Sequence, residues 1–255
     1  MADNKNILNL LAQFQSISLK EMDTVKLMNR TDTKYFFPLT ELPDILRAVS
    51  SHYFILTINN KQIASYKTLY YDTSNFDIYI THHNGKLNRF KVRIRHYVDS
   101  DIFFLEKKFK NNKSRTIKKR IKVSEFKTKF SKEEKDFIRQ FTSLNPEDLY
   151  PKLLNHFDRI TLVQPNDKER ITIDFNLGFS VNGSHTSEFH NIAIAEIKKD
   201  GRTHSVMEQL FRQEHIHPTG FSKYCTGIAT LYPEIKHNRF KYKLSQIKKI
   251  EYGTA

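Results

Sequence analysis

The stretch RFKVRIR, residues 89–95, alternates without a break between cationic and apolar side chains. Successive side chains of a β-strand point to opposite faces of the sheet, so this stretch is typical of a strand. One face would carry Arg89, Lys91, Arg93 and Arg95, while Phe, Val and Ile would lie on the other. We therefore predict a strand that packs one face on a core and turns four positive charges the other way.

The same period of two recurs elsewhere in the chain. Further strands are predicted at residues 30–37, 65–72, 104–108, 116–122, 158–163, 169–175 and 192–198. Within these strands ionic residues share a face, as Lys118 does with Arg120 and as Glu196 does with Lys198. The charged face is thus a repeated feature and not a property of one strand.

Predicted helices are fewer and lie between or after the strands. They cover residues 40–50, 131–141, 146–157, 205–214 and 222–231. Ser131 followed by Glu134 is a capping box, which marks a helix start. About eight strands with peripheral helices predict an α+β fold. No internal repeat or linker is visible, so we expect a single domain over residues 1–255.

Composition narrows the class of partner. The chain has 255 residues, and 42 Lys+Arg against 28 Asp+Glu give a net charge of +14, which favours a polyanion. Twenty Phe and 12 Tyr supply core material, and one Cys excludes an internal disulfide. No export signal and no apolar run of the ~20 residues that span a bilayer are present. We expect a cytoplasmic protein, with membrane attachment only through a separate partner protein.

Two structures explain the charged faces. The first is the solvated face of an antiparallel sheet, where polar and apolar residues also alternate. The second is a closed barrel whose inward cations surround an anion, because crowded and partly buried cations repel one another without one. Arginine suits forked contacts with phosphate oxygens, which favours polyphosphate as that anion.

Acidic residues on the same faces are candidate ligands of Mn²⁺ or Mg²⁺, which prefer carboxylate and phosphate oxygens. They are Glu106, Asp174 and Glu196. For Glu106 and Glu196, ion pairing with a neighbouring Lys or Arg is an equal alternative. We expect His82 and His83 in a solvated loop, as also His215 and His217, and Cys225 as a small buried residue.

The motifs, in order, resemble the VTC domain, the polyphosphate polymerase domain of the triphosphate tunnel metalloenzyme superfamily, also called CYTH-like. The resemblance covers about residues 27–232. It is carried by Arg30-Thr-Asp-Thr-Lys34-Tyr, Tyr70-Tyr-Asp-Thr73, Arg89–Arg95, Leu105-Glu-Lys-Lys108, Thr116–Arg120, Asp158-Arg159, Arg170–Asp174, Ala195–Lys198 and Phe221-Ser-Lys-Tyr224. It implies an antiparallel β-barrel of about eight strands with a basic tunnel inside.

The resemblance also implies chemistry: transfer of the γ-phosphate of ATP to a growing polyphosphate chain, with release of ADP and with Mn²⁺ or Mg²⁺. Lys34, Arg93, Arg95 and Glu196 would be catalytic, and Glu196 would also bind the metal. The implied substrate-binding residues are Arg30, Arg89, Lys91, Lys108, Lys118, Arg120, Arg159, Arg170, Lys198 and Lys223. Glu106 and Asp174 are further candidates for the metal.

Two other functions remain open. Related hydrolases begin with an ExExK strand, whereas this chain has Arg30-Thr-Asp-Thr-Lys34, which favours the polymerase over a triphosphatase. A non-catalytic polyphosphate-binding module would use the same basic faces. Specific nucleic-acid binding is not expected, because no recognition motif for it is present. The sequence does not define an oligomeric state.

Overall fold

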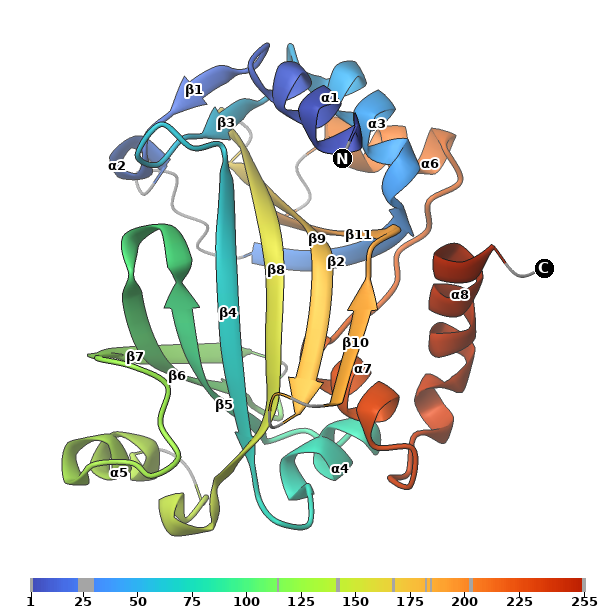
Figure 1. Ribbon diagram of the computed structural model, residues 1–255. Helices are drawn as coiled ribbons and strands as arrows, with labels where there is room; N and C mark the ends of the chain where they lie inside the picture. The colour runs from blue at the N-terminus through green and yellow to red at the C-terminus, as the bar shows by residue number, and fades with distance from the viewer. Residues whose placement is uncertain are drawn as a thin grey trace.

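The computed structural model describes residues 2–22, 30–113, 115–140, 143–166, 168–181, 183, 185–201 and 204–253. Its centre is one large sheet (Figure 1). The main strands are β2 (Arg30–Pro38), β4 (Ile63–Asp72), β5 (Arg89–Tyr97), β6 (Ile102–Lys110), β7 (Thr116–Val123), β8 (Tyr150–Gln164), β9 (Glu169–Val181) and β11 (Ile192–Asp200). They follow one another in the order β2-β11-β9-β8-β4-β5-β6-β7, and every pair along this path is antiparallel.

Shorter strands extend the sheet. They are β1 (Gln15–Ile17), β3 (Phe54–Leu56) and β10 (His185–Phe189). β10 pairs with β9, while β3 pairs with β8 and, in parallel, with β1. In the part of the chain that the structure describes, no ladder joins β2 to β7, so the sheet is curved but not closed by hydrogen bonds. The predicted α+β class with an antiparallel sheet is confirmed.

The helices lie around this sheet. They are α1 (Ala2–Leu11), α2 (Leu19–Met22), α3 (Leu42–Val49), α4 (Asp77–His83), α5 (Lys132–Arg139), α6 (Val206–Gln213), α7 (Lys223–Leu231) and α8 (Lys241–Tyr252). The capping box predicted at Ser131 and Glu134 is formed at the start of α5. None of the described helices is long and apolar enough to cross a bilayer.

One predicted helix is wrong. Residues 146–157 form only a single 3₁₀ turn, Pro146–Asp148, before β8 begins at Tyr150. Strand β8 pairs with β4 on one side and β9 on the other, so two ladders satisfy its backbone groups. These partners are distant in sequence, and tertiary pairing therefore overrides the local helical pattern.

The histidine prediction is wrong for the first pair. His82 and His83 end helix α4, and His83 is buried against Phe240 with a ring separation of 5.4 Å. His215 and His217 are exposed outside helices and strands, as expected, and Cys225 is buried. The packing of a downstream segment on α4, which local sequence does not encode, accounts for the difference.

A first core covers the outer face of the sheet. Helices α1, α3 and α6 pack there on apolar residues of β2, β8, β9 and β11, which occupy the positions between the charged ones (Figure 1). Tyr35 of β2, for example, is buried against Phe211 of α6, with ring centroids 4.7 Å apart. This core leaves the charged positions facing the opposite, inner side.

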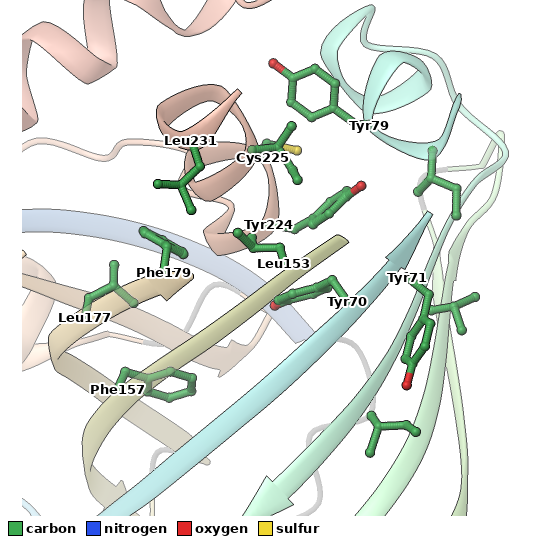
Figure 2. Close-up of a cluster of buried hydrophobic side chains, with 14 of the residues drawn as sticks. Tyr70, Tyr71, Tyr79, Leu153, Phe157, Leu177, Phe179, Tyr224, Cys225 and Leu231 are labelled. Carbon is green, nitrogen blue, oxygen red and sulfur yellow. The ribbon is translucent and has the colours of Figure 1, made fainter. Parts of the chain in front are cut away.

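Helix α7 packs on the inner face and fills one end of it. Figure 2 shows Tyr224 of α7 between Tyr70 of β4 and Tyr79 of α4. Close approach depends on Gly227, since a Cβ there would lie 2.5 Å from Leu153 Cδ2 and 2.6 Å from Phe179 Cδ1. The apolar part of α7 therefore fills this end of the inner face, and we call it the plug. The N-terminal end of α7 borders the charged part of the face.

Candidate functional site

Strand register assembles the charged side chains on one inner surface, because directly paired residues of neighbouring strands share a face. Lys34 of β2 pairs with Glu196 of β11, and Arg159 of β8 pairs with Asp174 of β9. Across the other half of the sheet, Glu106 of β6 pairs with both Arg93 and Arg120. The inner surface is thus charged across nearly the whole strand order.

The Glu196 carboxylate contacts two lysines, Lys34 on the paired strand β2 and Lys198 two residues further along β11. Its Oε1 lies 3.3 Å from Lys34 Nζ, and its Oε2 accepts a hydrogen bond from Lys198. Burial favours the neutral acid, but the charges of Lys34 and Lys198 outweigh it and hold the pKa of Glu196 well below its usual range. Glu196 is therefore a carboxylate bound between two cations.

Asp174 has an equivalent place. Arg159 donates to it with two nitrogens, Nη2 lying 2.8 Å from Oδ2, and Lys223 of α7 donates to the same oxygen. Burial again acts against ionisation, and Arg159 and Lys223 again hold the pKa of Asp174 low. This contact ties the start of α7 to the sheet.

Glu106 is the third such carboxylate. Arg93 Nε and Nη2 each lie 2.7 Å from its Oε2, and Lys118 Nζ lies 2.7 Å from its Oε1. Tyr70 Oη also accepts a hydrogen bond of 3.3 Å from Arg93. The ion-pair alternative considered for Glu106 and Glu196 is thus what the structure shows.

Three cations on the face, Lys91, Arg95 and Lys108, have no carboxylate ion-pair partner among the described residues. Arg95 is 8% exposed, and its Nε is buried without a hydrogen-bond partner. Lys91 donates to Ser222 Oγ at 2.9 Å. Loss of hydration, with repulsion from nearby cations, lowers the pKa of Lys91 to about 7 and that of Lys108 to about 8. These groups would gain most from a bound anion.

The two ends of the strand order approach one another. Lys34 of β2 acts electrostatically on Lys91 of β5 and on Lys108 of β6, although four and five strands lie between them in the sheet order. Lys34 Nζ also donates to the carbonyl of Phe221, at 3.3 Å, beside Ser222. The curved sheet and the residues before α7 therefore surround a common cationic space.

Aromatic rings form the floor of this space. Phe157 and Tyr66 are stacked with centroids 5.2 Å apart, and both lie under the guanidinium of Arg159, at 5.1 and 5.2 Å. Lys223 Nζ lies 4.2 Å from the Phe157 centroid, and Arg95 lies over Tyr66. Rings of this kind hold cations in position without neutralising them.

The remaining predicted site residues are placed as follows. Lys118 and Arg120 lie on β7, where Arg120 lies 4.4 Å over Phe104, and Arg170 lies opposite Lys198. Arg89 is at the edge of the face and donates to the Lys86 carbonyl. Arg30 begins β2, but its side chain lies outside the described residues. The inner surface therefore holds nearly all the predicted cations.

Three contributors were not predicted. Ser222 belongs to the Phe221–Tyr224 motif and to the predicted helix 222–231, but the sequence analysis gives it no role in the site, although a serine at a helix start is a ready hydrogen-bonding group. Phe157 was hidden by the wrong helix at residues 146–157, and Tyr66 lay in a strand whose partners were unknown. The β4–β8 pairing places Tyr66 directly opposite Phe157. The two stacked rings beneath Arg159 follow from that pairing, which the sequence pattern does not specify.

On the described part of the inner surface, protein ligands for a divalent metal are few. Among the described residues, no three His, Cys, Asp or Glu side chains gather as a metal-binding group. Glu106, Asp174 and Glu196 lie apart, each between two cations. A single carboxylate such as Glu196 still fits Mg²⁺ or Mn²⁺ when phosphate oxygens and water complete the coordination, which is how Mg²⁺ is commonly held.

Comparison with known proteins agrees with the resemblance noted from the motifs. A family model described as the VTC domain matches residues 29–232. A comparison with curated proteins gives no match.

Several solved structures are similar in part. An adenylyl cyclase candidate from Hippeastrum, described as having a dominant triphosphatase activity, is 13% identical, with a TM-score of 0.49, and the match covers 82% of this chain and 100% of that one. A candidate adenylate cyclase from Bacillus halodurans is 14% identical, with a TM-score of 0.48 and 80% and 100% coverage. The PH1012 protein from Pyrococcus horikoshii is 9% identical, with a TM-score of 0.42 and 75% and 97% coverage.

Proposed function

Because the chain belongs to the VTC domain family, we propose that it is a polyphosphate polymerase that transfers the γ-phosphate of ATP to a growing polyphosphate chain and releases ADP. The observation that carries the proposal is the excess of ordered cations on one curved face, of which Lys91, Arg95 and Lys108 have no carboxylate partner among the described residues. A phosphate chain carries a row of charged oxygens, and Arg and Lys form strong charge-assisted hydrogen bonds with such oxygens.

In this proposal Lys34, Arg93 and Arg95 hold the reacting phosphates. The other cations of the inner face, with Arg30, bind the rest of the substrate or the product. Glu106 holds Arg93, and Asp174 holds Arg159, in fixed orientations, so that little reorganisation is needed when substrate binds. We assign these two carboxylates to positioning in preference to metal binding.

Glu196 is proposed as the protein ligand of the divalent ion. The ion, when bound, would neutralise charge on the transferring phosphoryl group and orient its oxygens. Lys34 and Lys198, now paired with Glu196, would then be released to contact phosphate. The terminal phosphate of the acceptor chain is already ionised near neutral pH, so the proposal requires no strong general base.

The chain would act as one domain around a core at residues 27–232. It would work in the cytoplasm, meeting a membrane only through a partner protein.

Product analysis tests the reaction. Incubation of the purified protein with ATP and Mn²⁺, and separately with Mg²⁺, should yield ADP and long-chain polyphosphate in proportion. Release of orthophosphate from tripolyphosphate or ATP without polymer would instead identify a triphosphatase. Binding of polyphosphate with neither product would identify a non-catalytic module. The Glu196→Gln variant serves as the control for contaminating activity.

A further inference from the structure

Lys243, on the C-terminal helix α8, reaches the cationic space from outside the matched segment, which ends at residue 232. Its Nζ lies 3.9 Å from the position that a Cβ would take on Gly220. Gly220 directly precedes Phe221 and Ser222, the residues that contact Lys34 and Lys91. At this distance Lys243 Nζ is in van der Waals contact range of the segment that precedes α7.

The surroundings of Lys243 are cationic. Burial lowers its pKa, the thiol of Cys225 acts in the opposite direction, and the charge of Lys34 lowers the pKa further. The same two groups, Cys225 and Lys34, also act on the pKa of Lys91, in the same directions. Lys34, Lys91 and Lys243 therefore converge on the start of α7, and within the described chain neither Lys91 nor Lys243 has a carboxylate partner.

Helix α8 is fixed in place, so the position of Lys243 is part of the fold. The Glu251 carboxylate accepts hydrogen bonds from the backbone N–H groups of His190 and Asn191, at 3.0 and 2.9 Å. Ile247 is 1% exposed. Ahead of the helix, the Arg239 N–H donates to His83 Nε2 at 3.3 Å.

A cation cluster of this kind is costly without an anion and is suited to phosphate when one arrives. The first N–H groups of α7 add partial positive charge at the same point. Most basic residues of α8 are exposed, whereas Lys243 is half-buried and directed to this cluster.

We propose that Lys243 binds phosphate oxygens of the polyanionic substrate at the start of α7, together with Lys34 and Lys91. The inference rests on the proposed function for the class of substrate. It adds a binding residue from a helix that the family match does not include.

Calorimetric titration with tripolyphosphate tests the proposal in three variants, each checked for an unchanged melting temperature. Lys243→Gln should weaken binding about tenfold, as expected for loss of one charge-assisted hydrogen bond. Lys243→Arg should retain most of the affinity. Lys248→Gln removes the same charge from an exposed position of α8 and should change the affinity less than about twofold, because surface charges are screened.

Three results would overturn it. Equal affinity of Lys243→Gln and the unaltered protein would show that Lys243 does not contact the ligand. Equal losses in Lys243→Gln and Lys248→Gln would show an effect of net charge alone. Absence of tripolyphosphate binding in the unaltered protein would reject the substrate class itself, and with it the proposed function, and is distinguishable from the first two results.

Discussion

Lys34 and Glu196 occupy directly paired positions of β2 and β11, with Lys34 Nζ 3.3 Å from Glu196 Oε1. Arg93 and Glu106 repeat this relationship on β5 and β6, as do Arg159 and Asp174 on β8 and β9. Each carboxylate then takes a second cation from another position. The inner face is therefore organised before any ligand binds, by ion pairs that orient cations without neutralising all of them.

The first prediction concerns the Glu196→Gln variant. Loss of the carboxylate removes the proposed metal ligand, so polymerisation should fall about 100-fold or more, in the range seen when one charge-stabilising group is lost. Lys34 and Lys198 would lose their partner and remain available to phosphate. Tripolyphosphate binding in the absence of metal should therefore be retained or become tighter, as calorimetry can measure. A loss of both activity and binding in a folded variant would argue against metal ligation by Glu196.

The second prediction concerns Arg95, a buried cation without a carboxylate partner in the described chain. Replacement by the apolar Arg95→Met removes a charge that is costly to bury. The ligand-free protein should melt at the same or a higher temperature, while affinity for tripolyphosphate should fall about tenfold or more. Arg139→Met, at an exposed site on α5, is the matched control. A lower melting temperature with unchanged affinity would assign Arg95 to stability alone.

The third prediction is an unusual pH dependence of stability. The pKa of Lys91 is lowered to about 7, and those of Lys108, Lys118, Lys198 and Lys223 to about 8, each chiefly by loss of hydration. Unfolded lysines keep their protons up to a pKa of about 10.4, so between pH 7 and 10 the unfolded state binds more protons and folding is favoured as pH rises. The melting temperature of the ligand-free protein should increase from pH 6.5 to 9.

Saturating tripolyphosphate provides the control for this pH effect. A bound polyanion favours the charged lysines, so the stabilisation it gives should be larger at pH 6.5 than at pH 9. Carboxylates with a low pKa, such as Glu196, contribute stability that is lost only as the pH falls below about 4.5. A melting temperature that falls between pH 6.5 and 9 without ligand would contradict the lowered lysine pKa values.

The fourth prediction concerns Gly227 in the middle of α7. Alanine normally favours a helix over glycine, yet here its Cβ would overlap Leu153 and Phe179. Gly227→Ala should therefore reduce the free energy of unfolding by about 1–3 kcal/mol, as overpacking does. Chemical denaturation measures the change, with Ser245→Ala on an exposed face of α8 as the control. Stabilisation by Gly227→Ala would show that α7 is not held against the sheet at this distance.

Alternation was a reliable guide where a strand has one polar and one apolar face. It identified β5 from RFKVRIR, and β2, β7 and β11 in the same way, so most inner-face cations could be named from the sequence. It was less informative for β8, where Leu153 and Phe157 meet the plug on one face while Ile160 and Leu162 meet the outer core on the other. Residues 150–157, within the segment predicted as a helix, do alternate in burial, with Leu153, Asn155 and Phe157 buried on one face. Because Asn155 is polar, this alternation in burial is not an alternation of apolar and polar side chains, and the sequence pattern did not show it.

The sequence by itself determined the class of fold, the charge of one face and the family, because side-chain period and motif order are local properties of the chain. Only the tertiary structure decided which carboxylate meets which cation, since Glu106 and Lys118, or Asp174 and Lys223, meet through strand register and helix packing. It likewise brought Lys243 of α8 to Gly220. Contacts between distant segments depend on how the sheet curves and what fills its end, and no local pattern specifies either.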